Sequence, residues 1–477
     1  MWAGPPGCLL RQGQTFRQIF LVKICRGFRI MCKRPTLLCS VSDKTTNFEK
    51  FEKSRRKGPV LCYNKYDTTK RAANAAAEEA SGISEHYVRS VFQPLWHKKK
   101  VRKSFSKRLN AWQTFIACTG AEELTQKINQ HLLRWAREAD IQDETFIIDS
   151  ECPRFSSGDG KGLIKASIRG DDLFFIVDVG NYSCKYKIFG HENCMSPDDH
   201  FQDLKRLIQA ASGKAHRVSV VMPLLYGSRQ HRRNYRESLD CAVALQELQA
   251  LGVQNIVTFD AHDPRMQNAV PLMGLDNMMP TYQVIKAMIR CVPDLRLDSK
   301  HFMVISPDEG AMQRNMYYSS VLGVNLGMFY KRRDYSRVVN GRNPIVAHEY
   351  LGESVEGKDV FVADDIISSG ESMLDIAFAL KKQGARRIFA NATYAIFTNG
   401  LAAFDEAVEQ GVLNGVFGTN LTYLTPELKS RAWFHEVDVS KYIAYYIAAV
   451  NHDISVSAII DPHEKIRALL DKTYGKQ

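Results

Sequence analysis

The stretch DVFVADDIISSGES, residues 359–372, decides the fold. It reads as an apolar strand (359–363), then two adjacent carboxylates, Asp364 and Asp365, then a Ser/Gly turn that leads into a helix. Adjacent carboxylates can accept hydrogen bonds from a vicinal diol. A Ser/Gly turn at a helix N-terminus offers N–H groups and hydroxyls to a phosphate, so a sugar phosphate would satisfy both halves. The alternative is a capped helix start in which Asp and Ser only form the turn.

The chain around this stretch alternates short apolar strands with helical segments from about residue 121 onward. Buried strands that alternate with helices indicate parallel sheets covered on both faces. Ligands of such sheets bind beyond the carboxyl ends of the strands, so we look for the chemistry there. The predicted strands are 173–178, 218–222, 255–259, 302–305, 359–363 and 387–396.

Two helices are predicted from the spacing of apolar residues at three- and four-residue intervals. The first spans 121–139, and the second follows the Ser/Gly turn and ends at Gly384. We find no internal repeat and no low-complexity tract in the sequence. The apolar faces are Leu124, Ile128, Leu132 and Trp135 in the first helix, and Met373, Ile376, Ala377 and Leu380 in the second.

The composition of the 477 residues, 45% hydrophobic and 24% charged, is that of a globular chain with a sizeable core. No apolar run approaches the roughly 18–20 residues that a membrane helix needs, so we expect no membrane association. The formal net charge is +12, but residues 1–110 hold 24 Lys and Arg against 7 Asp and Glu. The rest of the chain is mildly acidic, and binding of nucleic acid is therefore not expected of it.

The basic segment, residues 1–120, has weak periodicity, and its first 42 residues contain no acidic side chain. We expect a poorly structured, dispensable extension. A targeting signal and an arm that binds nucleic acid or a partner remain alternatives.

The eleven cysteines are scattered and include no CxxC pair, which favours reduced thiols in the cytoplasm. One group in 184–200 imitates a zinc site, although its spacing matches no standard finger. We expect a polar loop there, with a metal site as the alternative. The group consists of Cys184, His191, Cys194 and His200.

The stretch 359–372 resembles the ribose-phosphate loop of the type I phosphoribosyltransferase fold. The wider chain is similar to ribose-phosphate pyrophosphokinases (PRPP synthetases) over about residues 145–460, because their motifs occur here in the same order. These motifs are RFSSGD at 154–159, RGDD at 169–172, MPLLYGSRQ at 222–230, FDAH at 259–262, SPDEG at 306–310 and YKRR at 330–333.

The resemblance implies two tandem phosphoribosyltransferase-like α/β domains, 121–280 with the ATP motifs and 281–440 with the ribose-phosphate loop. A C-terminal helix and tail would follow at 441–477. It also implies transfer of a diphosphoryl group from ATP to ribose 5-phosphate with Mg²⁺, in a homo-oligomer built from dimers, such as a hexamer. The alternatives are a catalytically silent regulatory subunit of the same family, and a phosphoribosyltransferase or nucleic-acid-binding regulator on the same fold.

Site residues are carried over from the resemblance motif by motif. Lys331 and Arg333 match the catalytic cations, and His262 and Asp308 match the magnesium positions. The resemblance implies ATP contacts at Arg229, Gln230 and His262, and adenine contacts from a neighbouring subunit at Phe155, Ser157 and Asp159. The implied ribose 5-phosphate site comprises Asp364, Asp365, Ser368, Ser369, Gly370 and Ser372.

The chain departs from the family pattern at several of these positions. Ser368 stands where the family usually has a third Asp, and Glu371 stands where it has Gly. Arg332 replaces a frequently acidic residue. The loop 231–240 and the polar stretch 184–200 also differ, which leaves regulation and nucleotide preference open.

Overall fold

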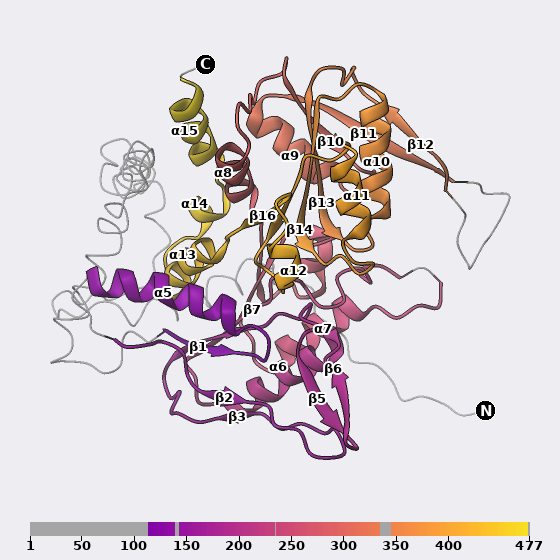
Figure 1. The fold of residues 1–477 in the computed structure, drawn as a ribbon. Helices are drawn as coiled ribbons and strands as arrows, with labels where there is room; N and C mark the ends of the chain where they lie inside the picture. Colours follow the sequence, from indigo (N-terminus) through magenta and orange to yellow (C-terminus); the bar gives the residue numbers. More distant parts are fainter. Residues whose placement is uncertain (1–112, 139–142, 234, 334–344, 476–477) are drawn as a thin grey trace, which may run out of the picture. The chain divides into compact units, whose positions relative to one another are not determined.

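The computed structural model describes residues 113–138, 143–233, 235–333 and 345–475, and all of them belong to one compact unit (Figure 1). Within 331–348 it describes only the backbone of the strands. The basic segment 1–112 lies outside the described residues, so our expectations for it stay predictions. No helix of the described part is long and apolar enough to cross a membrane.

The first sheet has five parallel strands in the order β1-β4-β7-β8-β9. Helices α6 and α7 bury their apolar sides on one face, against residues such as Ile116 and Phe175. Helix α5 covers the other face, against Phe115 and Phe174. The strands are β1 (Gln113–Ala117), β4 (Asp172–Ile176), β7 (Arg217–Val221), β8 (Asn255–Phe259) and β9 (Gly274–Met278), and the helices are α5 (Glu122–Glu138), α6 (Pro197–Ala211) and α7 (Asp240–Ala250).

Strand β1 corrects the boundary that we expected at residue 120. It pairs with β4 from Gln113 to Ala117, and its central residues Phe115 and Ile116 are 0% exposed. Apolar side chains on both faces of an edge strand anchor it in the sheet. The extension therefore ends before Gln113.

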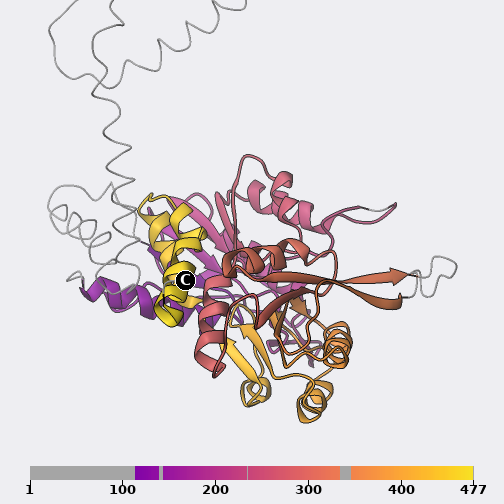
Figure 2. The ribbon, with the colours of Figure 1, turned by 90° about the horizontal axis from the view of Figure 1, so that it is seen from above.

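The second sheet has seven strands in the order β12-β11-β10-β13-β14-β15-β16, and only β12 is antiparallel to its neighbour. Figure 2 shows the paired strands β11 and β12 extending away from the rest of this sheet. The strands are β10 (Phe302–Ser306), β11 (Asn325–Arg333), β12 (Ile345–Leu351), β13 (Asp359–Ile367), β14 (Arg387–Ala395), β15 (Gly415–Thr419) and β16 (Phe434–Val437).

Helices bury both faces of the second sheet. On one face, α10 and α11 pack on alternate strand residues such as Val360 and Val362. On the other, α8, α9 and α13 pack on Phe361 and Ala363, in a core that continues into the first sheet. The helices are α8 (Thr281–Cys291), α9 (Met312–Leu322), α10 (Glu371–Lys382), α11 (Ala402–Glu409), α12 (Pro426–Lys429), α13 (Ser440–Asn451), α14 (Ser457–Ile460) and α15 (His463–Tyr474).

The architecture confirms the predicted fold class: an α/β protein with two sheets, parallel except for strand β12, that are flanked by helices. The segment 441–477, expected as a helix and tail, holds α13, α14 and α15, and α13 lies in the shared core. The two sheets also repeat one topology, because β1-β4-β7-β8-β9 and β10-β13-β14-β15-β16 have the same order. We had found no repeat in the sequence.

Candidate active site

The paired carboxylates lie on strand β13 itself, not after it. We expected the strand to end at residue 363, but its ladder with β14 continues to Ile367. The side chain of Asp365 is 9% exposed, whereas that of Asp364 is 28% exposed. The two neighbouring carboxylates therefore have different access to solvent.

The Ser/Gly turn connects β13 to α10. Gly370 has φ +86°, and a Cβ there would collide with the ring of Phe404, so the turn requires glycine. Ser368 accepts a backbone hydrogen bond from Thr398 at 2.9 Å, which ties the turn to the end of β14. Helix α10 begins at Glu371 without a side-chain cap, so its first N–H groups face the turn, where a phosphate could bind.

One contact joins this turn region to the first sheet. His262, three residues past β8, lies with Nδ1 2.8 Å from the Oδ2 of Asp365 on β13. The hydrogen bond with Asp365 raises the pKa of His262. Burial alone would raise the pKa of Asp365, but the partners His262 and Arg314 lower it well below its ordinary value. The motif expected at the ATP phosphates and the one expected at ribose thus meet.

Arg314 on α9 lies beneath the carboxylates, and we did not predict it as a site residue. Its side chain is 8% exposed, and its Nε donates to both oxygens of Asp260 at 2.8 Å. Its Nη1 is 3.4 Å from Asp364, and its Nη2 is 3.9 Å from Asp365. This buried cation compensates three carboxylates. Burial and the neighbouring charge of Asp365 nevertheless raise the pKa of Asp364 well above its usual range.

Asp308 lies between strand β10 and helix α9, which begins without a side-chain cap. Its Oδ1 accepts from the N–H of Ala311 at 3.0 Å, and its carbonyl accepts from Ser306 Oγ at 2.8 Å. Its charge also contributes to the raised pKa of Asp364. Asp308 thus lies close enough to the paired carboxylates for its charge to act on them, and its assignment as a magnesium position stays a prediction.

Arg229 and Gln230 lie in the connection between β7 and α7. The charge of Arg229 acts on His262, which brings that guanidinium to the same region. Gln230 Nε2 donates to the carbonyl of Ser238 at 2.9 Å and so holds the loop that we expected to be distinctive. The neighbouring His231 ring has its centroid 5.4 Å from that of His262.

Lys331 and Arg333 lie at the end of β11, opposite His348 and Ile345 of β12. Because β11 runs parallel to β10, both cations lie toward the carboxyl edge of the sheet, as Asp308 does. The register shifts between Arg332 and Arg333, so simple alternation does not assign the two cations to one face. Their side chains lie outside the described residues.

The turn 154–159 is not brought to these residues within one chain. The ring of Phe155 is exposed, and Ser157 Oγ donates to Asp159 at 2.8 Å. The backbone of the turn accepts from Phe189 at the tip of the hairpin β5–β6. The contact that we expect with adenine in a neighbouring subunit stays a prediction.

The stretch 184–200 forms a hairpin, β5 (Lys185–Ile188) and β6 (His191–Cys194), and the start of α6, where we expected a loop. Buried His200 has Nε2 2.7 Å from the carbonyl of Asn181. Across the described part of the chain, no group of three or more His, Cys, Asp and Glu residues could hold a metal ion.

The chain is similar in sequence to known domains and proteins. Residues 114–252 match the profile of the N-terminal domain of ribose phosphate pyrophosphokinase, and residues 275–395 match that of the phosphoribosyl transferase domain. The ribose-phosphate pyrophosphokinase of Vibrio parahaemolyticus is 28% identical over 327 residues, 67% of this chain and 94% of that protein. That of Pasteurella multocida is 27% identical over 315 residues, 65% of this chain and 90% of that protein.

The fold agrees with the same assignment. The crystal structure of phosphoribosylpyrophosphate synthetase from Mycobacterium smegmatis has a TM-score of 0.56 at 19% sequence identity, and the match covers 72% of this chain and 99% of that one. The tandem parallel sheets define a protein of the phosphoribosyltransferase fold class. Because the two domain profiles match in order along the chain, it belongs to the ribose-phosphate pyrophosphokinase family.

Proposed function

We propose that the chain is a ribose-phosphate diphosphokinase that converts ATP and ribose 5-phosphate into PRPP and AMP. The contact between His262 and Asp365 carries the proposal, because it joins the motif expected at ATP to the motif expected at ribose. Two bound substrates can react only if their binding sites adjoin, so that the reacting atoms are held in contact.

The proposed reaction makes one bond and breaks one. The anomeric O1 of ribose 5-phosphate attacks the β-phosphorus of ATP, and the bond from that phosphorus to the oxygen bridging to the α-phosphorus breaks. AMP leaves with the bridging oxygen, and the hydroxyl proton is released to water. Such a transfer needs charge neutralisation and alignment more than covalent catalysis.

The residues of this chain divide the work in the proposed mechanism. Asp364, the more exposed carboxylate, accepts the ribose hydroxyls, while Asp365 orients His262 toward the ATP phosphates. The turn with Ser368, Ser369, Gly370 and Ser372 binds the 5-phosphate at the N-terminus of α10. Lys331 and Arg333 stabilise the charge of the transferring diphosphoryl group.

Magnesium fits this site as a substrate-bound ion. Without a cluster of three protein ligands among the described residues, the protein would supply only Asp308 and His262, and phosphate oxygens and water would complete the shell. Bound there, Mg²⁺ supplies charge neutralisation of the ATP phosphates. Carboxylate and phosphate oxygens are the hard ligands that it prefers.

The proposal extends to the assembly and the compartment. We place the reaction in the cytoplasm and expect a homo-oligomer, because the exposed turn around Phe155 would contact adenine from a neighbouring subunit. Sedimentation measures the oligomer.

The test is an assay of the purified full chain with ATP, Mg²⁺ and ribose 5-phosphate. We expect AMP and PRPP in equal amounts, and no AMP without ribose 5-phosphate. A silent regulatory subunit would form neither product. A phosphoribosyltransferase would instead consume PRPP and release diphosphate when it is given a nucleobase.

A further inference from the structure

The two sheets correspond residue by residue, because in each sheet two neighbouring strands begin with an aspartate and an arginine that form an ion pair. In the first sheet, Asp172 at the start of β4 lies opposite Arg217 at the start of β7, with an N–O distance of 2.8 Å. In the second, Asp359 at the start of β13 lies opposite Arg387 at the start of β14, at 2.7 Å. These pairs align β4 with β13 and β7 with β14.

The alignment places Asp178 where the second sheet has Asp365. Asp178 stands six positions after Asp172, and Asp365 stands six positions after Asp359. Both carboxylates therefore lie at the carboxyl edge of the corresponding strand. Both are buried, with 4% and 6% of their surface exposed.

The same counting places Thr422 where the first sheet has His262. The next strand of each sheet begins at Asn255 (β8) or at Gly415 (β15). Each of these residues pairs with the residue that stands two positions after the aligned arginine on the neighbouring strand. His262 and Thr422 each follow seven positions later. The contact of His262 with Asp365, at 2.8 Å, thus has a counterpart in the contact of Thr422 with Asp178, at 2.9 Å.

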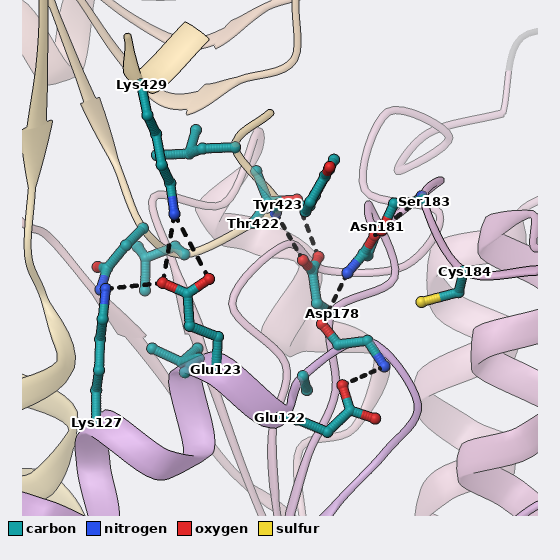
Figure 3. Close-up of a pocket in the computed structure, with 16 residues that line it drawn as sticks. Glu122, Glu123, Lys127, Asp178, Asn181, Ser183, Cys184, Thr422, Tyr423 and Lys429 are labelled. Atoms are coloured by element: carbon teal, nitrogen blue, oxygen red, sulfur yellow. Dashed lines mark hydrogen bonds and ion pairs between the residues drawn. The ribbon is translucent and has the colours of Figure 1, made fainter. Parts of the chain in front are cut away.

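The second contact lacks the surroundings of a sugar-phosphate site. The residues after Asp178 lead into the hairpin β5–β6 and not into a helix. Its carboxylate is fully engaged, as Figure 3 shows for the partners across the interface. Oδ1 accepts from Thr422 Oγ and the N–H of Gly180, both at 2.9 Å, and Oδ2 accepts from the N–H of Tyr423 at 2.8 Å.

The contact is also closely packed. A Cβ on Gly180 would lie 2.5 Å from Thr422 Oγ, so the threonine leaves no room for a side chain at position 180. Beside it, Glu123 on α5 pairs with Lys127 at 3.0 Å and with Lys429 on α12 at 3.3 Å, across a hollow of about 340 Å³ (Figure 3). These interactions tie the carboxyl edge of the first sheet to the second domain.

We propose that Asp178 is a positioning residue: its contact with Thr422 and Tyr423 holds the two sheets at the separation that the contact between His262 and Asp365 requires. The inference rests on the proposed function. Of the two corresponding contacts between the domains, that of His262 with Asp365 lies in the proposed active site, and that of Thr422 with Asp178 holds the domains in position.

A carboxylate is required at position 178. The backbone N–H groups of Gly180 and Tyr423 can only donate hydrogen bonds. Each donates to a different oxygen of Asp178. An asparagine in either orientation would turn its NH₂ group toward one of them. Asp178→Asn therefore breaks the contact with almost no change in volume.

The experiment compares the full-length wild type with Asp178→Asn. We expect the Kd of ribose 5-phosphate, measured by calorimetry without ATP, to stay within about twofold, because its site lies in the second domain. The kcat of AMP formation should fall about tenfold or more, since misplaced reacting groups lose rate steeply. Unchanged kcat would overturn the inference, and so would a parallel loss of both quantities.

A matched control and a milder variant accompany it. Asp172→Asn removes an equally buried carboxylate from the other end of β4 and should leave kcat and Kd unchanged. Thr422→Val removes one hydroxyl and should lower kcat about two- to tenfold. If Asp178→Asn does not fold, an unchanged kcat in Thr422→Val overturns the inference.

Hydrogen exchange supplies a readout without activity. Asp178→Asn, but not Asp172→Asn, should speed exchange in segments 260–264 and 363–369. Equal exchange in the two variants would overturn the inference, whether or not the wild type forms AMP. Absence of AMP from the wild type would refute the proposed function alone.

Discussion

Asp364 and Asp365 are neighbours in the sequence, but the structure gives them different surroundings. Asp365 is buried and bound by His262, whereas the side chain of Asp364 keeps part of its surface exposed. Arg314 lies within 4 Å of both carboxylates and so links their charges. Substitutions at these two positions should therefore have different consequences.

Asp364→Asn should weaken recognition of ribose 5-phosphate by about 0.5–1.5 kcal/mol, the range for a hydrogen bond between uncharged groups, because burial and Asp365 raise the pKa of Asp364 well above its usual range. ATP affinity should change little, because the contacts expected for ATP lie at Arg229, Gln230 and His262. Calorimetric titration of both substrates into the variant checks this. Unchanged affinity for ribose 5-phosphate would leave Asp364 and its neighbours in a purely structural turn.

Lys331→Ala should lower kcat by about 10²–10³, the scale for removal of one preorganised donor to a transition state. The KM values should change much less, because the cation acts on charge that develops during transfer. Steady-state kinetics separates the two quantities. A loss found entirely in KM would mean that Lys331 binds only the ground state.

The residues that the sequence predicted share a feature: they follow apolar strands in recognisable motifs. His262, Asp308 and the two carboxylates were singled out in this way, although the carboxylates lie on β13 and not after it, and their roles stay predictions. Arg314 was missed because it lies on a helix in no catalytic pattern, and only its burial against Asp260 reveals it.

The helices and strands were predictable to the extent that they carry apolar runs. Helix α5 and strands β4, β7, β8 and β10 lie within a residue or two of the predicted bounds. Strand β9, GLDNM, was missed because an edge strand with polar residues has no apolar run to recognise. Strand β1 was missed because it lies next to the basic segment.

This strand changes what a truncation should do. From the sequence we expect the segment 1–120 to be dispensable, but its last residues include β1. Deletion of residues 1–105 should leave a folded and active protein, whereas deletion of 1–117 should remove a buried strand and destabilise the first sheet. Thermal unfolding of both truncations decides this, and equal stability would show that β1 is dispensable.

The repeat emerges only when the whole molecule is considered. Among the aligned positions, only a few polar residues match, such as Asp172 with Asp359 and Arg217 with Arg387. The rest are generic apolar residues that any buried strand could carry, so a search of the sequence does not detect the repeat. Registers and contacts make it visible.

Asp178 should also give the molecule a measurable pH dependence. Burial raises its pKa to about 7, above the ordinary value of 3.8, although its hydrogen bonds act in the opposite direction. The folded state therefore holds the proton more tightly, so its contribution to stability is present below about pH 4 and is lost as the pH rises through 7. Between these two pH values Asp178 is protonated in the folded state but not in the unfolded state. There its contribution to the free energy of unfolding should fall by about 1.4 kcal/mol per pH unit.

Urea unfolding from pH 4.5 to pH 8 checks this slope. The difference between the wild type and Asp178→Asn should decline with rising pH and level off above about pH 7. Parallel curves for the two proteins would show that Asp178 does not titrate in this window.

The proposed function requires that this chain itself carry out the transfer. The most direct measurement uses ATP labelled at the γ-phosphorus, together with Mg²⁺ and ribose 5-phosphate, and follows the label and AMP together. We expect one labelled PRPP for each AMP formed, and neither product without ribose 5-phosphate. Label released as inorganic phosphate, or an absence of AMP from the intact folded protein, would contradict it.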